Sequence, residues 1–594
     1  MHILQNIILP ENKNIPSELY FRYEEITENK FEKNNKKIFK FNTYFGSISL
    51  NTWFEKAELE EVGITIDFSG SCQISVFQDD GVYPPKEIHK QEFKNFINQN
   101  FTFLLNKSKD IKGIMYPIIE SNCDEFLFQK GFYWTSNNPR HDINIAIIMP
   151  TFKREKYIYN NIDSLTNDVL KNYNDKIELF IIDNGKTLNI DKNIKNVRII
   201  QNLNYGGSGG FARGVLEVLK ESRFTHALFC DDDIIIEPES IKRLHSLLKF
   251  IKDKYIIGGG MLSISNKSIL HEVGATLSDS GIIIGSQING IDLINVNSLR
   301  LYDQQSNVNY FAWVFFACPM KAFVEEGLPL PFFLNYDDIE FGYRLNLRGY
   351  NLISMLGLGV WHEDFERKYS SVSSYYVTRN YLITIWCHYP QIKLNRIKLI
   401  LKLYSNFIAR LKTYRYENAE FLLNGIQDAL KGPKFLKDTC PEELHAKFIS
   451  SQQEIKIKVK INDDIRTKYN KKIKKTIIRK IRIIFSILTF NGHLLPDYLM
   501  YKNANLEFDY NVESLRSYRF SEIYRYSKII YYEPLQSEGV ICYINRKRFF
   551  RLFFSFIFIL FKLIFKNSKM IREWKGEFNE LISLEFWNKY LKIN

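Results

Sequence analysis

Cysteine is scarce in this sequence, which has seven scattered cysteines among 594 residues and no Cys-x-x-Cys pair. An odd number of isolated cysteines indicates reduced thiols, and it argues against a zinc site built on cysteine pairs. Long apolar runs are also missing, because the longest charge-free one, Leu552 to Phe561, is too short to cross a bilayer. The first residues lack the basic and apolar segments of a secretory signal. We therefore expect a cytoplasmic protein that does not cross a membrane.

Charge is abundant but uneven. The formal net charge is +13, and nine Lys or Arg with no acid lie between Arg466 and Arg482. A second basic segment, "NRKRFFRLFFSFIFILFKLIFKNSK" from Asn545, is rich in Phe and Ile. An anionic partner is expected, and lipid headgroups fit the interleaved apolar residues better than nucleic acid does. The alternatives are long charged stems that shield an apolar face, a buried helix or a contact in a homo-oligomer.

Three regions differ in pattern. Residues 1–138 alternate apolar and polar positions in short pieces, which predicts an antiparallel β-sandwich. Residues 139–385 alternate apolar strands with helices, which predicts a mostly parallel sheet covered on both faces. Residues 386–594 are predicted to be mainly helical. Ligands of such sheets bind at the carboxyl ends of the strands, where "MPTFKR", "DNG", "NLNYGGSGG" and "DDD" fall.

The triplet Asp231 to Asp233 follows the apolar strand "HALFC". Side chains alternate in extended backbone, so Asp231 and Asp233 point to one side and Asp232 to the other. Two carboxylates on one side can share a hard divalent cation, which removes their repulsion. The alternative is a solvated acidic turn.

A glycine-rich loop lies ahead of the triplet. "GSGGFA", from Gly207, matches the dinucleotide fingerprint, and Asp231 follows about 20 residues later. A Rossmann dehydrogenase is therefore one alternative, although the loop follows the third predicted strand rather than the first. The glycines also suit a tight strand-to-helix turn, or a loop that approaches a nucleotide or sugar closely.

A second acidic cluster occurs in "FLNYDDIEFGYRL", where Asp337, Asp338 and Glu340 occupy the first turn of a predicted helix. The helix dipole favours acids there, yet capping explains one acid better than three. His362 follows the apolar segment "NLISMLGLGV". It is either a structural histidine or a metal ligand at another strand end that faces the same cleft.

These motifs carry a resemblance. "IAIIMPTFKRE", "IIDNG", "NLNYGGSGGFARG", "FCDDDI", "FLNYDDIEFGYRL" and "VWHEDF", in this order and spacing, resemble bacterial galactofuranosyltransferases of glycosyltransferase family 2. The resemblance covers about residues 143 to 380. It implies an α/β GT-A core, here with an N-terminal β-sandwich and a helical C-terminal region. It also implies inverting transfer of galactofuranose from UDP-galactofuranose to a growing surface glycan or lipid-linked acceptor.

The resemblance assigns roles to individual residues. The implied ligands of Mn²⁺ or Mg²⁺ are Asp231, Asp233 and His362, and the cation would neutralise the departing diphosphate. Asp338 would be the general base, with Asp337 and Glu340 beside it. Eight residues would bind the nucleotide sugar: Thr151, Arg154, Asp183, Asn204, Gly206, Gly207, Asp232 and Trp313. Trp313 would stack on sugar, or else be a core residue, and its segment "AWVFF" has less tryptophan than the family tends to carry.

Two further alternatives remain open. The same fold could use another nucleotide sugar, or the chain could be a nonenzymatic glycan-binding protein whose β-sandwich does the binding. Retention of DDD, DDxE and the histidine speaks against the second, because a binding relic has no chemical need for all three. The expected location is the cytoplasmic face of the inner membrane, where a peripheral protein would reach lipid-linked acceptors.

Overall fold

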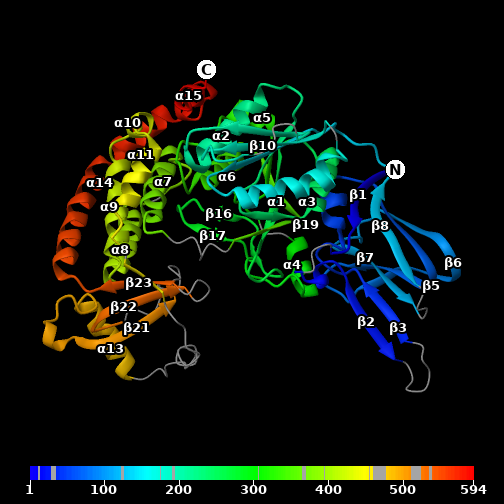
Figure 1. Cartoon of the computed structure of the whole chain (residues 1–594), viewed down its shortest axis with the longest axis horizontal. Helices are drawn as coiled ribbons and strands as arrows, with labels where there is room; N and C mark the ends of the chain where they lie inside the picture. The colour runs from blue at the N-terminus through cyan, green and yellow to red at the C-terminus, as the bar shows by residue number, and fades with distance from the viewer. Residues whose placement is uncertain are drawn as a thin grey trace.

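The computed structural model describes residues 1–593 except 11–13, 28–34, 122–125, 174, 190–193, 305–306, 364–369, 394, 454, 459–476, 510–522 and 534–537. Most of the basic stretch 466–482 therefore lies outside the described residues. Figure 1 shows a strand-rich N-terminal domain, a central α/β domain and a C-terminal region with the long helix α14 at its outer edge.

The N-terminal domain is built from antiparallel strands with alternating buried and accessible residues. Its elements are β1 (His2–Ile7), β2 (Arg22–Thr27), β3 (Asn35–Lys40), β4 (Ile48–Ser49), β5 (Glu61–Asp79), β6 (Lys86–Asn106), β7 (Ile114–Ser121) and β8 (Leu127–Thr135), with short helical turns at Ser17–Leu19 and Asn51–Lys56. The long strand β5 pairs with β8 over its first half and with β7 over its second half. One strand thus connects the two halves of the predicted sandwich into a single hydrogen-bonded sheet.

The central domain contains a sheet of order β11-β10-β9-β12-β18-β14-β19-β13, with β15 beside β14. The strands are β9 (Ile145–Thr151), β10 (Ile177–Asp183), β11 (Val197–Gln201), β12 (His226–Phe229), β13 (Ile234–Ile236), β14 (Tyr255–Ser263), β15 (Leu270–Glu272), β18 (Phe316–Pro319) and β19 (Asn351–His362). Strands β9 to β12 are parallel, as their apolar runs predict, whereas β18 runs antiparallel between β12 and β14. A small hairpin, β16 (Ala275–Leu277) and β17 (Ile283–Gly285), lies apart from the sheet.

Helices of this domain cover the sheet and connect its strands. They are α1 (Glu155–Leu165) with a π-helical turn at Thr166–Leu170, α2 (Gly206–Leu219), α3 (Pro238–Phe250), α4 (Val296–Gln304), α5 (Met320–Glu326) and α6 (Asp337–Leu347). Helix α3 also packs against β1. There the fully buried Arg243 donates to the backbone oxygens of Asn6 and Phe45 at 2.7 and 2.8 Å. These charge-assisted hydrogen bonds of the Arg243 guanidinium connect the central domain to the N-terminal domain. One hydrophobic core also extends through both domains.

The C-terminal region consists of α7 (Ser373–Cys387), α8 (Arg396–Lys412), α9 (Tyr416–Ala429), α10 (Lys434–Asp438), α11 (Pro441–Ser450), α13 (Ile477–Leu488), α14 (Arg546–Leu581), α15 (Leu584–Tyr590) and a short turn at Asp497–Leu499. It also contains a four-stranded sheet that the sequence patterns did not predict, formed by β20 (Ile455–Lys458), β21 (Tyr501–Asp509), β22 (Tyr526–Glu533) and β23 (Glu538–Tyr543). Among the described residues, no helix is both long and apolar enough to span a bilayer.

The chain returns to the central domain at its end. Helix α15 packs on α2, where the Tyr590 and Tyr205 rings meet edge to face at 4.9 Å. The Trp587 indole N–H donates to the Pro329 carbonyl at 2.9 Å. The last helix therefore supports the loop that leads into the glycine-rich start of α2.

Candidate active site

The candidate site lies at the carboxyl ends of the parallel strands. Thr151 and Asp183, the last residues of β9 and β10, are register partners. The triplet Asp231 to Asp233 follows β12 and leads into β13, which pairs with the end of β19 so that Ile234 opposes His362. Parallel strands end at one edge of a sheet, and the β13–β19 pairing brings the histidine to that same edge.

Three predicted metal ligands are brought together at this edge. The His362 Nε2 lies 3.3 Å from Asp233 Oδ1 and 3.7 Å from Asp231 Oδ2. One ligand atom from each of the three residues lies within 4.8 Å of the other two. His362 and Asp233 are buried, whereas Asp231 is partly exposed. Two carboxylates and one imidazole, with an accessible side, suit Mn²⁺ and are also compatible with Mg²⁺.

Asp232 points away from this cluster, as the alternation predicts. It accepts a hydrogen bond from the Thr151 hydroxyl at 2.8 Å, and its backbone oxygen accepts from Asn161 at 3.2 Å. Burial, with the Asp231 charge added, raises the pKa of Asp232 to about 6. Arg154 pairs with Asp233 and lies 3.8 Å from Asp232, so its guanidinium compensates the acids at the mouth of the site.

Two residues that were predicted to bind the nucleotide, one on β10 and one after β11, form hydrogen bonds with the backbone of the neighbouring loops. The buried Asp183 accepts from the backbone N–H of Gly185 and of Leu188, at 3.0 and 2.9 Å. Asn204 accepts from the Gly206 N–H at 3.2 Å. Both side chains therefore hold the backbone of the loops that follow these strands, a role that the spacing of the motifs does not reveal.

The glycine-rich loop packs against the second acidic motif. Gly206 has φ +68°, and a Cβ there would lie 2.1 Å from the Phe333 carbonyl oxygen. A Cβ at Gly207 would lie 3.5 Å from Asp337 Oδ2, and the neighbouring Ser208 hydroxyl donates to that oxygen at 3.0 Å. Only glycine at position 206 permits this close approach without strain. The start of α2 and the start of α6 thus form one wall of the site.

The carboxyls of Asp337 and Asp338 form a coupled pair beside the metal ligands. Burial raises the pKa of Asp337 to about 6. Burial, followed by the charges of Asp337, Glu272 and Asp231, raises the pKa of Asp338 well above its usual range. A raised pKa makes the ionised carboxylate a stronger base, and this form could accept a proton from a hydroxyl group. The sequence patterns did not indicate Glu272, because no local motif surrounds it.

The backbone before these two acids is strained. Phe333, Asn335 and Tyr336 all have positive φ, at 74°, 63° and 71°. The Asn380 side chain donates to the carbonyls of Leu334 and Asn335, at 2.9 and 2.8 Å. Left-handed backbone at non-glycine residues costs energy and persists where the surroundings hold it. The same helix contributes Arg379, which donates to the Phe332 carbonyl at 2.6 Å, and neither residue was predicted from sequence.

Two residues that were predicted to belong to the site, Glu340 and Trp313, are buried among other side chains of the protein. Glu340 is fully buried, 2.9 Å from both Arg344 Nε and His388 Nε2. Burial raises the pKa of Glu340, but these two neighbours outweigh burial and lower it. This environment suits a structural ion pair between α6 and α7. Trp313 is buried among Phe211, Phe229, Phe316 and Phe341, so its ring lies in the aromatic core. The role of each in catalysis or sugar binding stays a prediction.

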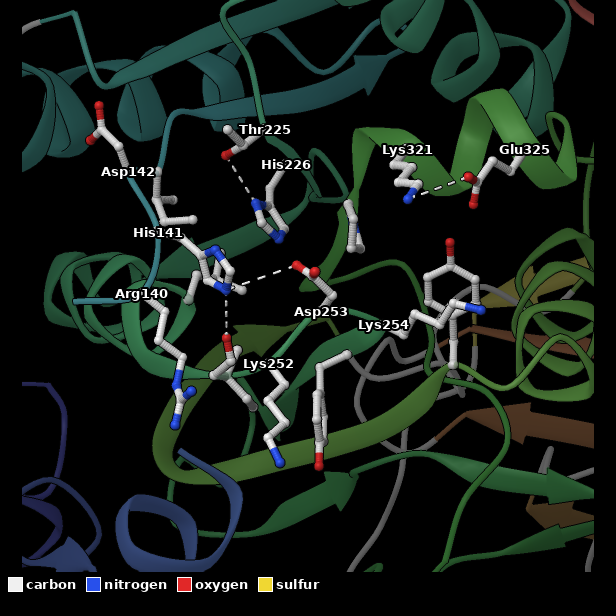
Figure 2. Close-up of a pocket in the computed structure, with 16 residues that line it drawn as sticks. Arg140, His141, Asp142, Thr225, His226, Lys252, Asp253, Lys254, Lys321 and Glu325 are labelled. Carbon is white, nitrogen blue, oxygen red and sulfur yellow. Dashed lines mark hydrogen bonds and ion pairs between the residues drawn. The ribbon is translucent and has the colours of Figure 1, made fainter. Parts of the chain in front are cut away.

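A large cavity, about 970 Å³, lies at the opposite end of the sheet. Figure 2 shows His226 beside Thr225, His141 toward Asp253, and Lys321 beside Glu325. His226 begins β12, whereas the acidic triplet follows the end of that strand. Volume alone therefore does not locate the candidate active site.

Comparison with known proteins agrees with the motifs. The profile described as "Glycosyl transferase family 2" matches residues 146–310. Galactofuranosyltransferase GlfT2 of Mycobacterium tuberculosis is 26% identical over 428 residues, and that of Mycolicibacterium smegmatis is 25% identical over 422. Each match covers 67% of this chain and 66% or 64% of the relative. The chain thus spans slightly less than two thirds of the length of these relatives.

Similarity to solved structures is weaker. GalNAc-T7 with UDP, GalNAc and Mn²⁺ has a TM-score of 0.34 at 13% identity, covering 44% of this chain and 50% of that one. S. aureus TarS 1-349 has a TM-score of 0.31 at 15% identity, covering 52% and 86%. With TM-scores this low, the GT-A assignment rests on the family match and the sheet. Residues 146–310 of the central domain thus match glycosyl transferase family 2, and the mixed sheet around them agrees with a GT-A fold.

Proposed function

We propose that this chain is an inverting, metal-dependent glycosyltransferase that moves galactofuranose from UDP-galactofuranose to a hydroxyl of a growing glycan. One observation carries the proposal: the Asp231, Asp233 and His362 cluster lies close enough to the Asp337–Asp338 pair for the Asp231 charge to act on both. A site for a cation and a site for proton transfer would therefore lie beside each other.

Asp231, Asp233 and His362 are the residues that would hold Mn²⁺ or Mg²⁺. When bound there, the cation would supply positive charge to the diphosphate as it leaves. Arg154, already paired with Asp233, presents further planar N–H donors to an anionic ligand at the same mouth. The backbone loops fixed by Asp183 and Asn204 would border the nucleotide.

Asp338 is proposed as the general base. It lies in the first turn of α6, where the Ile339 N–H donates to its Oδ1 at 2.8 Å. It would accept the proton of the acceptor hydroxyl while that oxygen attacks the anomeric carbon opposite the leaving UDP. A single displacement of this kind inverts the anomeric configuration. Asp337, held by Ser208, would keep the negative charge that strengthens the base.

The donor sugar is inferred from relatives. Both curated relatives bear the name galactofuranosyltransferase, which supports galactofuranose, whereas the family match alone fits several nucleotide sugars. A lipid-linked or surface glycan is the proposed acceptor. Transfer from another nucleotide sugar is the alternative that a donor screen resolves.

The test is a donor screen with Mn²⁺, galactoside acceptors and detection of products by mass spectrometry. The variant Asp338→Asn should lose transfer yet keep UDP binding. The matched control Asp253→Asn changes an exposed aspartate near the far cavity and should leave transfer unchanged. Full activity in excess EDTA would contradict the metal roles of Asp231 and Asp233. Transfer from a different donor alone would reject galactofuranose and retain the enzyme class.

A further inference from the structure

Helix α14 has an apolar face on each of two opposite sides. One side packs into the C-terminal core through Phe549, Leu552, Phe556, Ile559 and Leu563. The other side presents five solvent-exposed phenylalanines, spaced four, four, three and four residues apart: Phe550, Phe554, Phe558, Phe561 and Phe565. Their exposed fractions run from 38% to 81%. A surface helix ordinarily has polar residues opposite its core face, so this stripe indicates a binding surface.

Basic residues accompany the exposed stripe. From Arg546 to Arg572 the chain has eight Lys or Arg and no acid. Lys547, Arg551, Lys562, Lys566 and Lys569 are exposed. The Lys562 ammonium lies 4.3 Å from the centre of the Phe558 ring. Arg551 pairs with Glu420, and the lysines from Lys547 to Lys569 add positive charge along about 33 Å of helix.

Helix α13 also has exposed apolar side chains. Its exposed side chains are Ile481, Ile484, Phe485, Ile487 and Leu488. Phe490, just after α13, packs against Phe549 and Phe553 at the start of α14, with ring centroids 5.5 and 5.7 Å apart. Figure 1 shows α14 along the outer edge of the molecule, with α13 near its first turns. The end of α13 therefore lies beside the start of α14.

The geometry points to an anionic lipid bilayer as the partner of this outer face of α14. Phenylalanine rings would enter the boundary between headgroups and acyl chains, and the lysines beside them would meet lipid phosphates. A symmetric contact with a second copy would instead place like charges against each other. The described helices are too short or too polar to span the bilayer, which fits docking on its surface. This inference rests on α13 and α14 alone and is independent of the proposed transferase activity.

Sedimentation of the full chain with vesicles tests the inference. Vesicles of equal phosphatidylcholine and phosphatidylglycerol should capture the protein, whereas pure phosphatidylcholine should capture little. Raising the salt from about 0.1 to about 0.5 M should weaken capture, because screening lengths shorten. Replacing Lys562, Lys566 and Lys569 by Gln should lower the partition coefficient on the order of a hundredfold.

A single variant in which Phe554, Phe558, Phe561 and Phe565 are all replaced by Ser should also lose capture by the anionic vesicles. Its matched control replaces two exposed apolar side chains of the N-terminal domain, Tyr83 and Ile97, by Ser and should bind like the parent. Circular dichroism checks folding, and the lysine variant carries the test if the serine variant unfolds. Equal binding to both vesicle types, or unchanged binding by the lysine variant, would overturn the inference. A stable oligomer that the serine variant dissolves, without vesicle capture, would assign the face to a second copy.

Discussion

Replacing Gly206 by Ala tests whether the glycine-rich loop and the acidic helix form one wall. Gly206 has φ +68°, and the new Cβ would lie 2.1 Å from the Phe333 carbonyl oxygen. A backbone oxygen cannot rotate away, so either α2 or the segment before Asp337 must move. That segment is already held in positive φ at Phe333 and Tyr336. The substitution therefore disturbs the position of the two carboxyls as well as overall stability.

The loss of folding stability expected for Gly206→Ala has two parts. Left-handed backbone at a residue with a Cβ costs roughly 1–2 kcal/mol. Gly349→Ala isolates this part, because Gly349 has φ +84° and nothing lies within 4 Å of its added Cβ. Gly206→Ala should cost the same amount plus an overpacking penalty of about 1–3 kcal/mol. The two variants thus differ mainly in the contact with Phe333.

Urea unfolding and transfer kinetics measure the two effects. We expect Gly349→Ala to lower the free energy of unfolding without changing kcat/KM for the nucleotide sugar. Gly206→Ala should lower both, with kcat/KM falling on the order of tenfold or more, because a misplacement of about 1 Å is costly in a catalytic site. Equal losses of stability and equal kcat/KM for the two variants would refute the proposed wall.

Burial raises the pKa of Asp303 to about 7. Because the pKa of this carboxyl is higher in the folded than in the unfolded chain, its ionisation should lower the free energy of unfolding by about 2–3 kcal/mol as the pH rises from 5 to 8. The variant Asp303→Asn should lack this part of the pH dependence in denaturant unfolding. Glu340→Gln should destabilise the fold by about 3–5 kcal/mol, because it leaves the buried Arg344 poorly compensated, and a change below 1 kcal/mol would contradict the structural ion pair. Glu272→Gln should move the acidic limb of the rate profile to lower pH, because the Glu272 charge helps to raise the pKa of Asp338.

Strand ends and the shared side of Asp231 and Asp233 were accessible from sequence because they follow local patterns, whereas His362 as a third ligand was implied only by the family resemblance. Apolar runs such as "HALF" predict buried strands, and alternation predicts that Asp231 and Asp233 share a side. The structure brings both close to His362, as the family resemblance implies. The environment of Trp313 was ambiguous because an aromatic-rich sequence is equally typical of a core strand and of a ligand-binding wall. Its packing with Phe211 and Phe341, which the sequence does not show, places the ring in the core.

Other features depend on contacts between distant segments. Glu272 comes near Asp338 only after β15 joins the sheet, and Asn380 supports the strained backbone from α7. Neither residue stands in a recognisable motif. The sheet β20 to β23 was missed because its pairing joins segments more than about 80 residues apart, within a region whose basic and apolar runs favour helix. Local periodicity does not contain such pairings.

The most direct test of the central claim is the product formed from UDP-galactofuranose, Mn²⁺ and a galactoside acceptor. We expect the parent chain to lengthen the acceptor by hexosyl units, with inverted anomeric configuration determined by NMR. Asp338→Asn and Asp233→Asn should yield no product, while each retains the folded circular dichroism spectrum. Product formation by Asp338→Asn at the parent rate would contradict the proposed base, and no product from any nucleotide sugar would contradict the account of this cleft as a site of glycosyl transfer.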